Sequence, residues 1–207
     1  SLTSLVFEAG SRLKTIGSWA FQYNSKLAGT LTIPASVETI DGGAFYNCGS
    51  LTKVQVYKQA LVSGASSFFS GTVELVTMSP TKTPTNTPTA SPTTNPTIAP
   101  PTGSPTLSPT STPTTDNCNG KSGHLEIPEG TTEIKSEEYK GCDDITSASF
   151  PSTLKKIGSY AFSSNSKLAG TLTIPASVET IDSYAFFYCS LTSLVFEAGS
   201  RLKTIGS

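Results

Sequence analysis

The chain has one histidine and little charge of either sign. His124 is its only imidazole, so a Ser-His-Asp or Cys-His arrangement has one candidate base and no partners grouped around it. Lys, Arg, Asp and Glu together make up 14% of the residues, with a formal net charge of -1. No basic stripe could therefore neutralise a phosphate backbone. These shortages argue against hydrolytic catalysis and against nucleic acid as a partner.

Long apolar runs and ion-binding motifs are also absent. No run of about 18 apolar residues occurs, so no membrane span is expected here. No charged and apolar leader stands at residue 1, and Met78 is the only methionine; a signal peptide would have to lie outside this stretch. No EF-hand or nonapeptide calcium spacing is present, and no cofactor or metal is expected. The acidic residues that do group together are expected to form a solvated edge: Glu133, Glu137, Glu138, Asp143 and Asp144.

Proline is concentrated in one segment. Ten of the 14 prolines lie between Pro80 and Pro113, in a repeated Pro-Thr pattern such as "PTKTPTNTPTASPTTNPT". Such a segment has too few apolar residues to offset its conformational entropy, and is expected to be disordered and polyproline-II-like. We interpret residues 78–115 as a linker, either a bare spacer or an O-glycosylated stalk. No permitted Asn-x-Ser/Thr sequon occurs, so N-glycans are not expected.

The sequence on either side of this segment repeats. Ile16 recurs as Ile40, and Ile134, Ile157, Ile181 and Ile205 keep nearly the same spacing. A longer period is superimposed, because "SLTSLVFEAGSRLKTIGS" occupies both residues 1–18 and 190–207, and "NSKLAGTLTIPASVETID" both 24–41 and 165–182. The first phrase recurs at a greater distance along the chain than the second. The difference between these two distances equals the length of two short repeat units. Two kinds of rung therefore alternate, and we expect these residues to be part of a longer array.

Each unit contains one short alternating segment, as in Leu31 and Ile33 or Leu172 and Ile174. This is the pattern of a strand with one buried face. A strand that recurs about every 24 residues buries that face by stacking on its neighbours, so the pattern predicts a solenoid with one short strand per rung and an irregular or 3-10 return side. The expected domains are residues 1–77, with three rungs and a C-terminal cap, the linker over 78–115, and residues 116–207, with four rungs and a truncated C-terminal end.

The repeated phrases "IGSYAF", "SVETID" and "LTIP" resemble the BspA-like class of leucine-rich repeats over roughly four fifths of the chain. The resemblance implies a horseshoe-shaped binding scaffold on surface or secreted adhesins, and recognition rather than catalysis. Fold alone does not decide function. The rungs depart from the pattern at "FEAGSRL" and at "YKQALVSGASSFFSGTVELVTM". We interpret the second of these stretches as the cap of the first module.

Cysteine alternates with asparagine at one position of the repeat. This position is expected to bond turn backbone, as a structural ladder formed by Asn24, Cys48, Cys142, Asn165 and Cys189. Cys142 and Cys189 are two rungs apart, about 10 Å, which is too far for a disulfide. Cys118 lies seven residues before the expected strand residue Leu125, and Cys142 lies six residues before Ala148, the equivalent residue of the next strand. The two lie at equivalent places on adjacent rungs, so a Cys118–Cys142 disulfide is predicted to close the first rung of the second module.

The outward strand residues are the predicted ligand face, because they line up across the rungs. Most of these side chains carry small hydroxyl groups. A surface of this kind favours tight protein binding less than a surface rich in aromatic side chains. Its members are Thr30, Thr32, Lys53, Gln55, Tyr57, His124, Glu126, Ser147, Ser149, Thr171, Thr173 and Ser193.

These observations predict a non-catalytic extracellular or cell-surface protein, whose partner is an extracellular protein or a carbohydrate. The alternative is a structural wall or coat component that self-associates through unpaired strand edges. A third reading, in which the hydroxyl ladder binds crystalline polysaccharide, mineral or ice, is weakened by irregular Ser and Val positions.

Overall fold

The computed structural model describes residues 2–7, 10–57, 74–78, 118 and 120–206. These residues form strands and turns, and none of them belongs to a helix that could cross a membrane. Ser1–Pro80 and Asp116–Ser207 belong to one compact unit. Except for Met78, the predicted linker over 78–115 lies outside the described residues. The expected separation into two modules is not shown, because both repeat blocks belong to the same unit.

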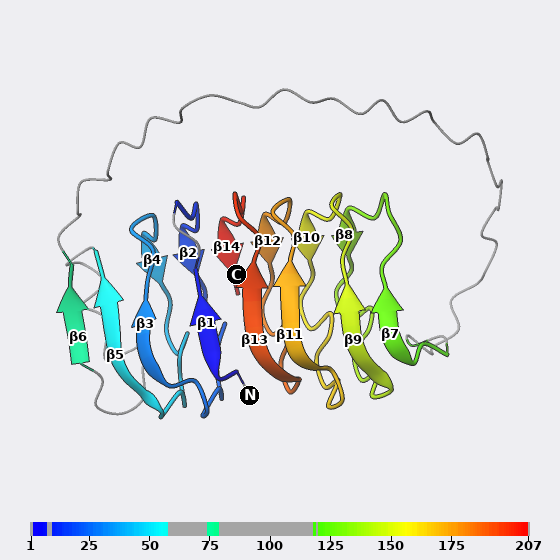
Figure 1. The fold of residues 1–207 in the computed structure, drawn as a ribbon, viewed down its shortest axis with the longest axis horizontal. Helices are drawn as coiled ribbons and strands as arrows, with labels where there is room; N and C mark the ends of the chain where they lie inside the picture. The colour runs from blue at the N-terminus through cyan, green and yellow to red at the C-terminus, as the bar shows by residue number, and fades with distance from the viewer. Residues whose placement is uncertain (1, 8–9, 58–73, 79–117, 119, 207) are drawn as a thin grey trace, which may run out of the picture. The chain divides into compact units, whose positions relative to one another are not determined.

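The longer strands are parallel and follow one another in a single row (Figure 1). Hydrogen-bonded neighbours occur in the orders β7-β9, β11-β13-β1 and β3-β5-β6, and β9 contacts β11 as β1 contacts β3. The row therefore runs from β7 at one end to β6 at the other. The strands are β1 (Ser4–Val6), β3 (Gly29–Thr32), β5 (Leu51–Val56), β6 (Glu74–Thr77), β7 (Gly123–Glu126), β9 (Ile145–Ser149), β11 (Ala169–Ile174) and β13 (Ser190–Phe196).

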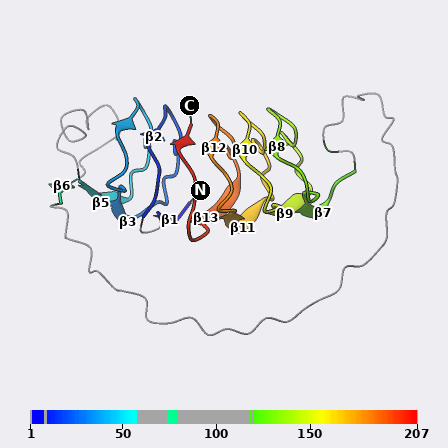
Figure 2. The same cartoon turned by 90° about the horizontal axis from the view of Figure 1, so that it is seen from above.

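A second sheet of two-residue strands lies across the core from the first (Figure 2). Each short strand is a pair such as Thr39-Ile40, with the isoleucine buried. The expectation of one strand per rung was therefore incomplete, because two residues are too short to produce an alternating sequence signal. The strands, in sheet order, are β4 (Thr39–Ile40), β2 (Thr15–Ile16), β14 (Thr204–Ile205), β12 (Thr180–Ile181), β10 (Lys156–Ile157) and β8 (Glu133–Ile134).

The two blocks join where the duplicated phrase stacks on itself, and we call this junction the seam. Strand β1 pairs with β13, with Leu5 opposite Leu194. Strand β2 pairs with β14, with Ile16 opposite Ile205. Every pair across the seam joins two copies of the same residue of the duplicated phrase. The junction thus continues the regular stack, because identical phrases present identical strand edges and identical core residues.

The core is a column of aliphatic residues from both sheets, completed by phenylalanines. Each short strand leads into a turn-rich stretch that runs to the next long strand, and we call these stretches return segments. They cover residues 17–28, 41–50, 135–144, 158–168 and 182–189. Their inward-facing phenylalanine rings stack rung upon rung, with centroids 5.2 Å apart for Phe21 and Phe45 and 5.6 Å apart for Phe162 and the half-buried Phe186. This continuous burial stabilises units that could not fold singly.

The β7 end of the stack is closed covalently. Cys118 and Cys142 form a disulfide, with their Cα atoms 5.3 Å apart. The first rung of an array has no preceding rung to cover it, and the disulfide ties the residues ahead of β7 to the next rung. At the other end, β6 pairs with β5, with Leu75 opposite Val54. The rest of the predicted cap of the first block, residues 58–73, lies outside the described residues.

Candidate functional site

The predicted ligand face lies on the outward side of the long strands. Its members occupy equivalent positions on neighbouring strands, and Thr32 Oγ1 donates to Gln55 Oε1 at 3.0 Å. Tyr57 follows β5 and is half-buried. Tyr57 is the one Phe, Tyr or Trp residue in this group, so the face offers mainly hydroxyls, an amide, an imidazole and scattered charges. The register aligns Thr30 with Lys53, Thr32 with Gln55, His124 with Ser147, Glu126 with Ser149, Thr171 with Ser193, and Thr173 with Val195.

His124 is exposed on this face and hydrogen-bonds to two hydroxyl groups of the next strand. Its Nδ1 lies 2.8 Å from Ser147 Oγ and its Nε2 lies 3.1 Å from Ser149 Oγ. A base that activates a serine needs a second group to orient its other ring nitrogen. Here both nitrogens contact serine hydroxyls, and the ring joins β7 to β9. The arrangement is suited to holding two strands together.

The acidic residues grouped near β8 and β9 lie at the surface and contact cations or hydrogen-bond donors. Asp143 accepts hydrogen bonds from the backbone and hydroxyl of Ser166, which lower the pKa of its carboxyl group. Glu133, Glu137 and Asp144 contact lysines at 3.6, 2.8 and 2.9 Å, and Glu138 accepts from the backbone of Lys135. Within the part of the chain that the structure describes, no group of three His, Cys, Asp or Glu residues could hold a metal ion.

The asparagines and cysteines of the predicted turn ladder make unequal contacts. Cys48 Sγ lies 3.1 Å from the carbonyl oxygen of Phe21, and Cys189 Sγ lies 3.0 Å from that of Phe162. Asn24 accepts from the N–H of Leu2 and donates to Phe21. The amide of Asn165 is fully buried, and neither its nitrogen nor its oxygen has a hydrogen-bond partner among the described residues.

Burial makes the two free thiols weak acids. Desolvation raises the pKa of Cys48 to about 11 and that of Cys189 to about 12, against a reference of 9.0. A cysteine acts as a nucleophile or metal ligand through its thiolate. At neutral pH both groups are therefore thiols, and they contribute to packing and to the turn ladder.

Large aromatic side chains gather on the return side of the stack, opposite the predicted ligand face. They touch in an unbroken series: Trp19 to Tyr46 (5.8 Å between ring centroids), Tyr46 to Tyr23 (6.0 Å), Tyr23 to Phe187 (6.4 Å), Phe187 to Tyr184 (5.3 Å) and Tyr184 to Tyr160 (4.9 Å). Tyr188 joins the series at Phe187. We call these seven residues the aromatic face. Tyr188 is 68% exposed and Tyr23 46% exposed, so polar and apolar ring surfaces are both accessible to a partner.

Local backbone conformation orients these rings. Trp19, Tyr160 and Tyr184 occupy the same place in three return segments, and each has a positive φ, between 56° and 61°. Bulky residues rarely adopt this conformation, and Gly43 takes the equivalent place in the next rung. An added Cβ on Gly43 would lie 2.2 Å from the Trp19 ring. The signal for this surface in the sequence is the aromatic residue just before three of the four Ala-Phe pairs, whereas the sequence analysis predicted the ligand face on the outward strand residues.

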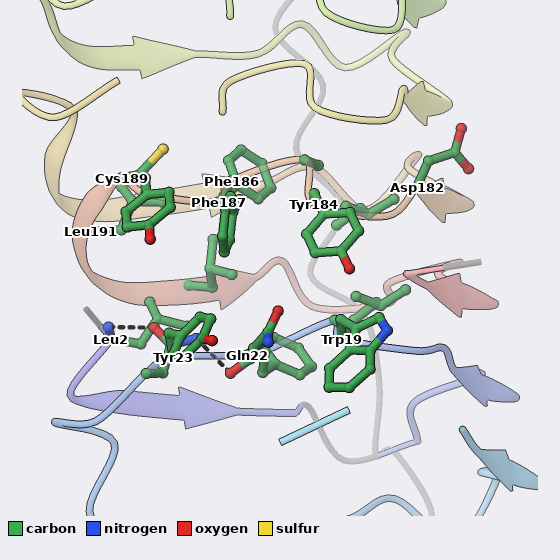
Figure 3. A pocket seen from close by; sticks show the side chains of 18 of the residues that line it. Leu2, Trp19, Gln22, Tyr23, Asp182, Tyr184, Phe186, Phe187, Cys189 and Leu191 are labelled. Carbon is green, nitrogen blue, oxygen red and sulfur yellow. Dashed lines mark hydrogen bonds between the residues drawn. The ribbon is translucent and has the colours of Figure 1, made fainter. Parts of the chain in front are cut away.

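A pocket opens at the seam, in the middle of the aromatic face. It has a volume of about 200 Å³. One wall comes from the return segment 182–189 and the other from the segment 17–28 (Figure 3). Tyr184 and Phe187 face Trp19 and Tyr23 across it, and the core residues Leu191 and Leu194 are among those that line it. The pocket therefore has an aromatic rim and an aliphatic lining.

Comparison with known proteins agrees with this architecture. A family model described as the BspA type leucine rich repeat region matches six copies, over residues 1–89 and 116–207. No curated protein and no solved structure matches the chain significantly.

Proposed function

Because the chain belongs to the BspA-type leucine-rich repeat family, whose members are generally surface or secreted proteins, we propose that it is a non-catalytic recognition scaffold. It acts at the cell surface or outside the cell, and it binds a protein or a glycan. The aromatic face is the binding surface. The observation that carries this proposal is the continuous series of ring contacts from Trp19 to Tyr160.

Physical chemistry favours this surface over the strand face. Tyr and Trp present large contact areas at small cost in side-chain entropy, and they dominate binding energies at interfaces. Their ring faces attract cations and polarised C–H groups, so the same surface suits a protein or a sugar ring. Lys140 already lies 5.2 Å from the centroid of Tyr160, so the aromatic face interacts with a cation within the protein.

Binding measurements on two surface variants test the proposal. The immobilised chain of residues 1–207 is screened against extracellular matrix proteins, whole cells and a set of glycans. Tyr46→Ser with Tyr188→Ser alters the aromatic face, and Thr32→Ala with Gln55→Ala is the matched change on the strand face. We expect at least a tenfold loss of affinity in the first variant and little change in the second. The reverse result would assign binding to the strand face, and absence of any ligand for the wild type would contradict the proposal.

Self-association remains the second candidate, and the seam supports it. Strands β13 and β14 pair with β1 and β2 through identical phrases. If the seam opens, the same edges can pair between copies, and this exchange would give open head-to-tail assemblies. Sedimentation velocity over a hundredfold range of concentration tests this function, with a single monomeric boundary as the outcome that excludes it.

A further inference from the structure

The seam brings together two arginines from distant parts of the chain. Arg12 and Arg201 hold the same place in the duplicated phrase, two residues before Lys14 and Lys203. The backbone N–H of Lys14 donates to the carbonyl oxygen of Lys203 at 2.8 Å, and β2 and β14 continue side by side from this point (Figure 1). The two arginines are therefore one rung step apart, about 4.8 Å between their backbones. We call Arg12, Lys14, Arg201 and Lys203 the basic edge.

The two loops that carry these cations have the same local structure. Gly10 and Gly199 have φ angles of 79° and 77°. The backbone N–H groups of Leu13 and Leu202 each donate to the hydroxyl group of the serine two residues earlier, at 3.3 Å. Both leucines are buried, whereas the arginine and the lysine on either side of each leucine are exposed. Each loop therefore presents its two cations to solvent, and the matching cations of the two loops are neighbours.

The positive charge of the basic edge is only partly neutralised by the residues that the structure describes. Lys14 lies 2.6 Å from Glu38, and Lys203 lies 2.6 Å from Glu179. Neither arginine forms an ion pair with a described residue. Like charges on directly neighbouring strands repel each other and reduce stability. Two adjacent guanidinium groups of this kind are therefore an unfavourable arrangement that a bound anion would relieve.

The acidic residue of the second loop is engaged elsewhere. Glu197 precedes Arg201 by four residues, but its carboxylate accepts a hydrogen bond from the backbone N–H of Ala176 at 3.0 Å. Its counterpart in the first loop, Glu8, lies outside the described residues. The carboxylate of Glu197 thus holds the loop against the preceding rung and leaves the arginine available to a ligand.

The positive charge also extends to the next rungs. The pKa of the Glu179 carboxyl group is lowered, first by the hydrogen bond and charge of Lys203 and then by the charges of Lys155 and Arg201. Lys155 lies one rung beyond Glu179, whose backbone N–H donates to the Lys155 carbonyl oxygen at 2.8 Å. Cations therefore outnumber carboxylates from Lys155 to the basic edge.

We propose that the basic edge binds the oxyanion groups, sulfate or carboxylate, of an acidic polysaccharide. An arginine side chain presents a planar fork of N–H donors that holds two oxygens of one such group, and it is less strongly hydrated than lysine. Two adjacent forks suit a chain of closely spaced anionic groups, and the flanking lysines add charge. The basic edge lies ahead of the short strands, whereas the aromatic face lies in the return segments that follow them. The inference adds a second surface and a ligand class to the recognition function proposed above, and it rests on the extracellular location given there.

Binding to immobilised polysaccharides at low salt tests the inference. The chain of residues 1–207 is passed over heparin, which carries sulfate and carboxylate groups, and over hyaluronan, which carries carboxylate alone. Saturable binding to heparin is expected, and it should weaken steeply as salt is added, because binding to a polyanion releases counterions. Binding to heparin alone would identify sulfate as the preferred group, and equal binding to both would show that a carboxylate suffices. Double-stranded DNA bound as tightly as heparin would contradict the assignment to a polysaccharide.

Three double variants locate the site. Arg12→Ser with Arg201→Ser should weaken heparin binding at least tenfold. Arg12→Lys with Arg201→Lys keeps the charge but removes the forks, and should weaken binding at least threefold. Lys26→Ser with Lys121→Ser is the matched control, because it removes the same charge from exposed lysines ahead of the long strands, and affinity should stay within twofold. Absence of saturable heparin binding, or an equal loss in the control and the arginine-to-serine variant, would overturn the inference.

The aromatic-face variant separates this inference from the proposed function. Tyr46→Ser with Tyr188→Ser should leave heparin affinity within twofold. If heparin does not bind but another extracellular ligand is lost in this variant, the inference fails while the proposed function stands. Heparin binding that depends on the arginines, without any ligand that depends on the aromatic face, would support the basic edge and contradict the aromatic face as the binding surface.

Discussion

Lys14 lies directly beside Lys203, because the backbone N–H of Lys14 donates to the carbonyl oxygen of Lys203 at 2.8 Å. Each lysine contacts a glutamate on its other side, Lys14 with Glu38 and Lys203 with Glu179, both at 2.6 Å. In the rungs next to the seam the alternation of two kinds of rung places lysine next to glutamate. At the seam the same phrase stacks on itself, and like charges become neighbours.

Exchanging one of these ion pairs should therefore strengthen the seam. The double variant Lys14→Glu with Glu38→Lys keeps the pair between positions 14 and 38 and places a carboxylate next to Lys203. All these side chains are exposed, so we expect a gain of about 0.5 kcal/mol in unfolding free energy. Thermal denaturation at low salt measures it, and the gain should disappear in about 1 M NaCl because exposed pairs are screened. A fall in Tm at low salt would contradict the like-charge interpretation.

The disulfide at the β7 end should stabilise the first rung. Cys118 and Cys142 are separated by 24 residues, and closing a loop of this length contributes about 3 kcal/mol in the chain-entropy description. Reduction of the wild type, or the variant Cys118→Ser with Cys142→Ser, should lower the denaturation midpoint by a corresponding amount. The variant itself is the control, because its midpoint should not respond to reductant. An equal response to reductant in both proteins would show that the disulfide is not the cause.

The buried thiols should make stability depend on pH in the alkaline range. The pKa of Cys48 is raised to about 11 and that of Cys189 to about 12 from 9.0, so the folded state favours the neutral thiols. Their contribution is complete below pH 9 and is lost as the pH rises towards 11 to 12. Urea denaturation from pH 8 to 11 should show a falling unfolding free energy. Cys48→Ala with Cys189→Ala should flatten the slope; an unchanged slope would assign the effect to other groups, including Tyr139, whose pKa is also raised.

The two asparagines of the turn ladder should respond in opposite ways to substitution. Asn165→Cys introduces the residue found at Cys189 in the next rung and removes a buried amide that has no partner among the described residues. A gain of about 1 kcal/mol is expected, because an unsatisfied buried polar group is costly. Asn24→Ala removes two hydrogen bonds, to Leu2 and Phe21, and should cost about 1–2 kcal/mol. Chemical denaturation of both variants decides the matter, and equal losses would contradict it.

The repeat period predicted most of the local structure. The alternation in segments such as Leu31-Thr32-Ile33 predicted where the long strands lie and which of their residues are buried, as the structure shows. Successive residues of a strand point to opposite faces, so alternation in the sequence identifies the buried face. The two-residue strands such as β4 escaped detection because they carry no such pattern. The aromatic face was missed for a different reason. Trp19 and Tyr184 lie in opposite blocks of the chain, and their proximity depends on which rungs become neighbours.

By itself the sequence determined the rung, its length, its inward and outward residues, and the spacing that sets Cys118 beside Cys142, because each of these is a local periodic property. Only the tertiary structure decided the order of the rungs. An identical phrase at positions 1–18 and 190–207 presents the same edge wherever it occurs, so the sequence does not distinguish one stacking partner from another. The folded chain places β1 against β13 and β2 against β14. That choice creates the seam, joins the aromatic rings of both blocks into one surface, and lines one pocket with residues of both blocks.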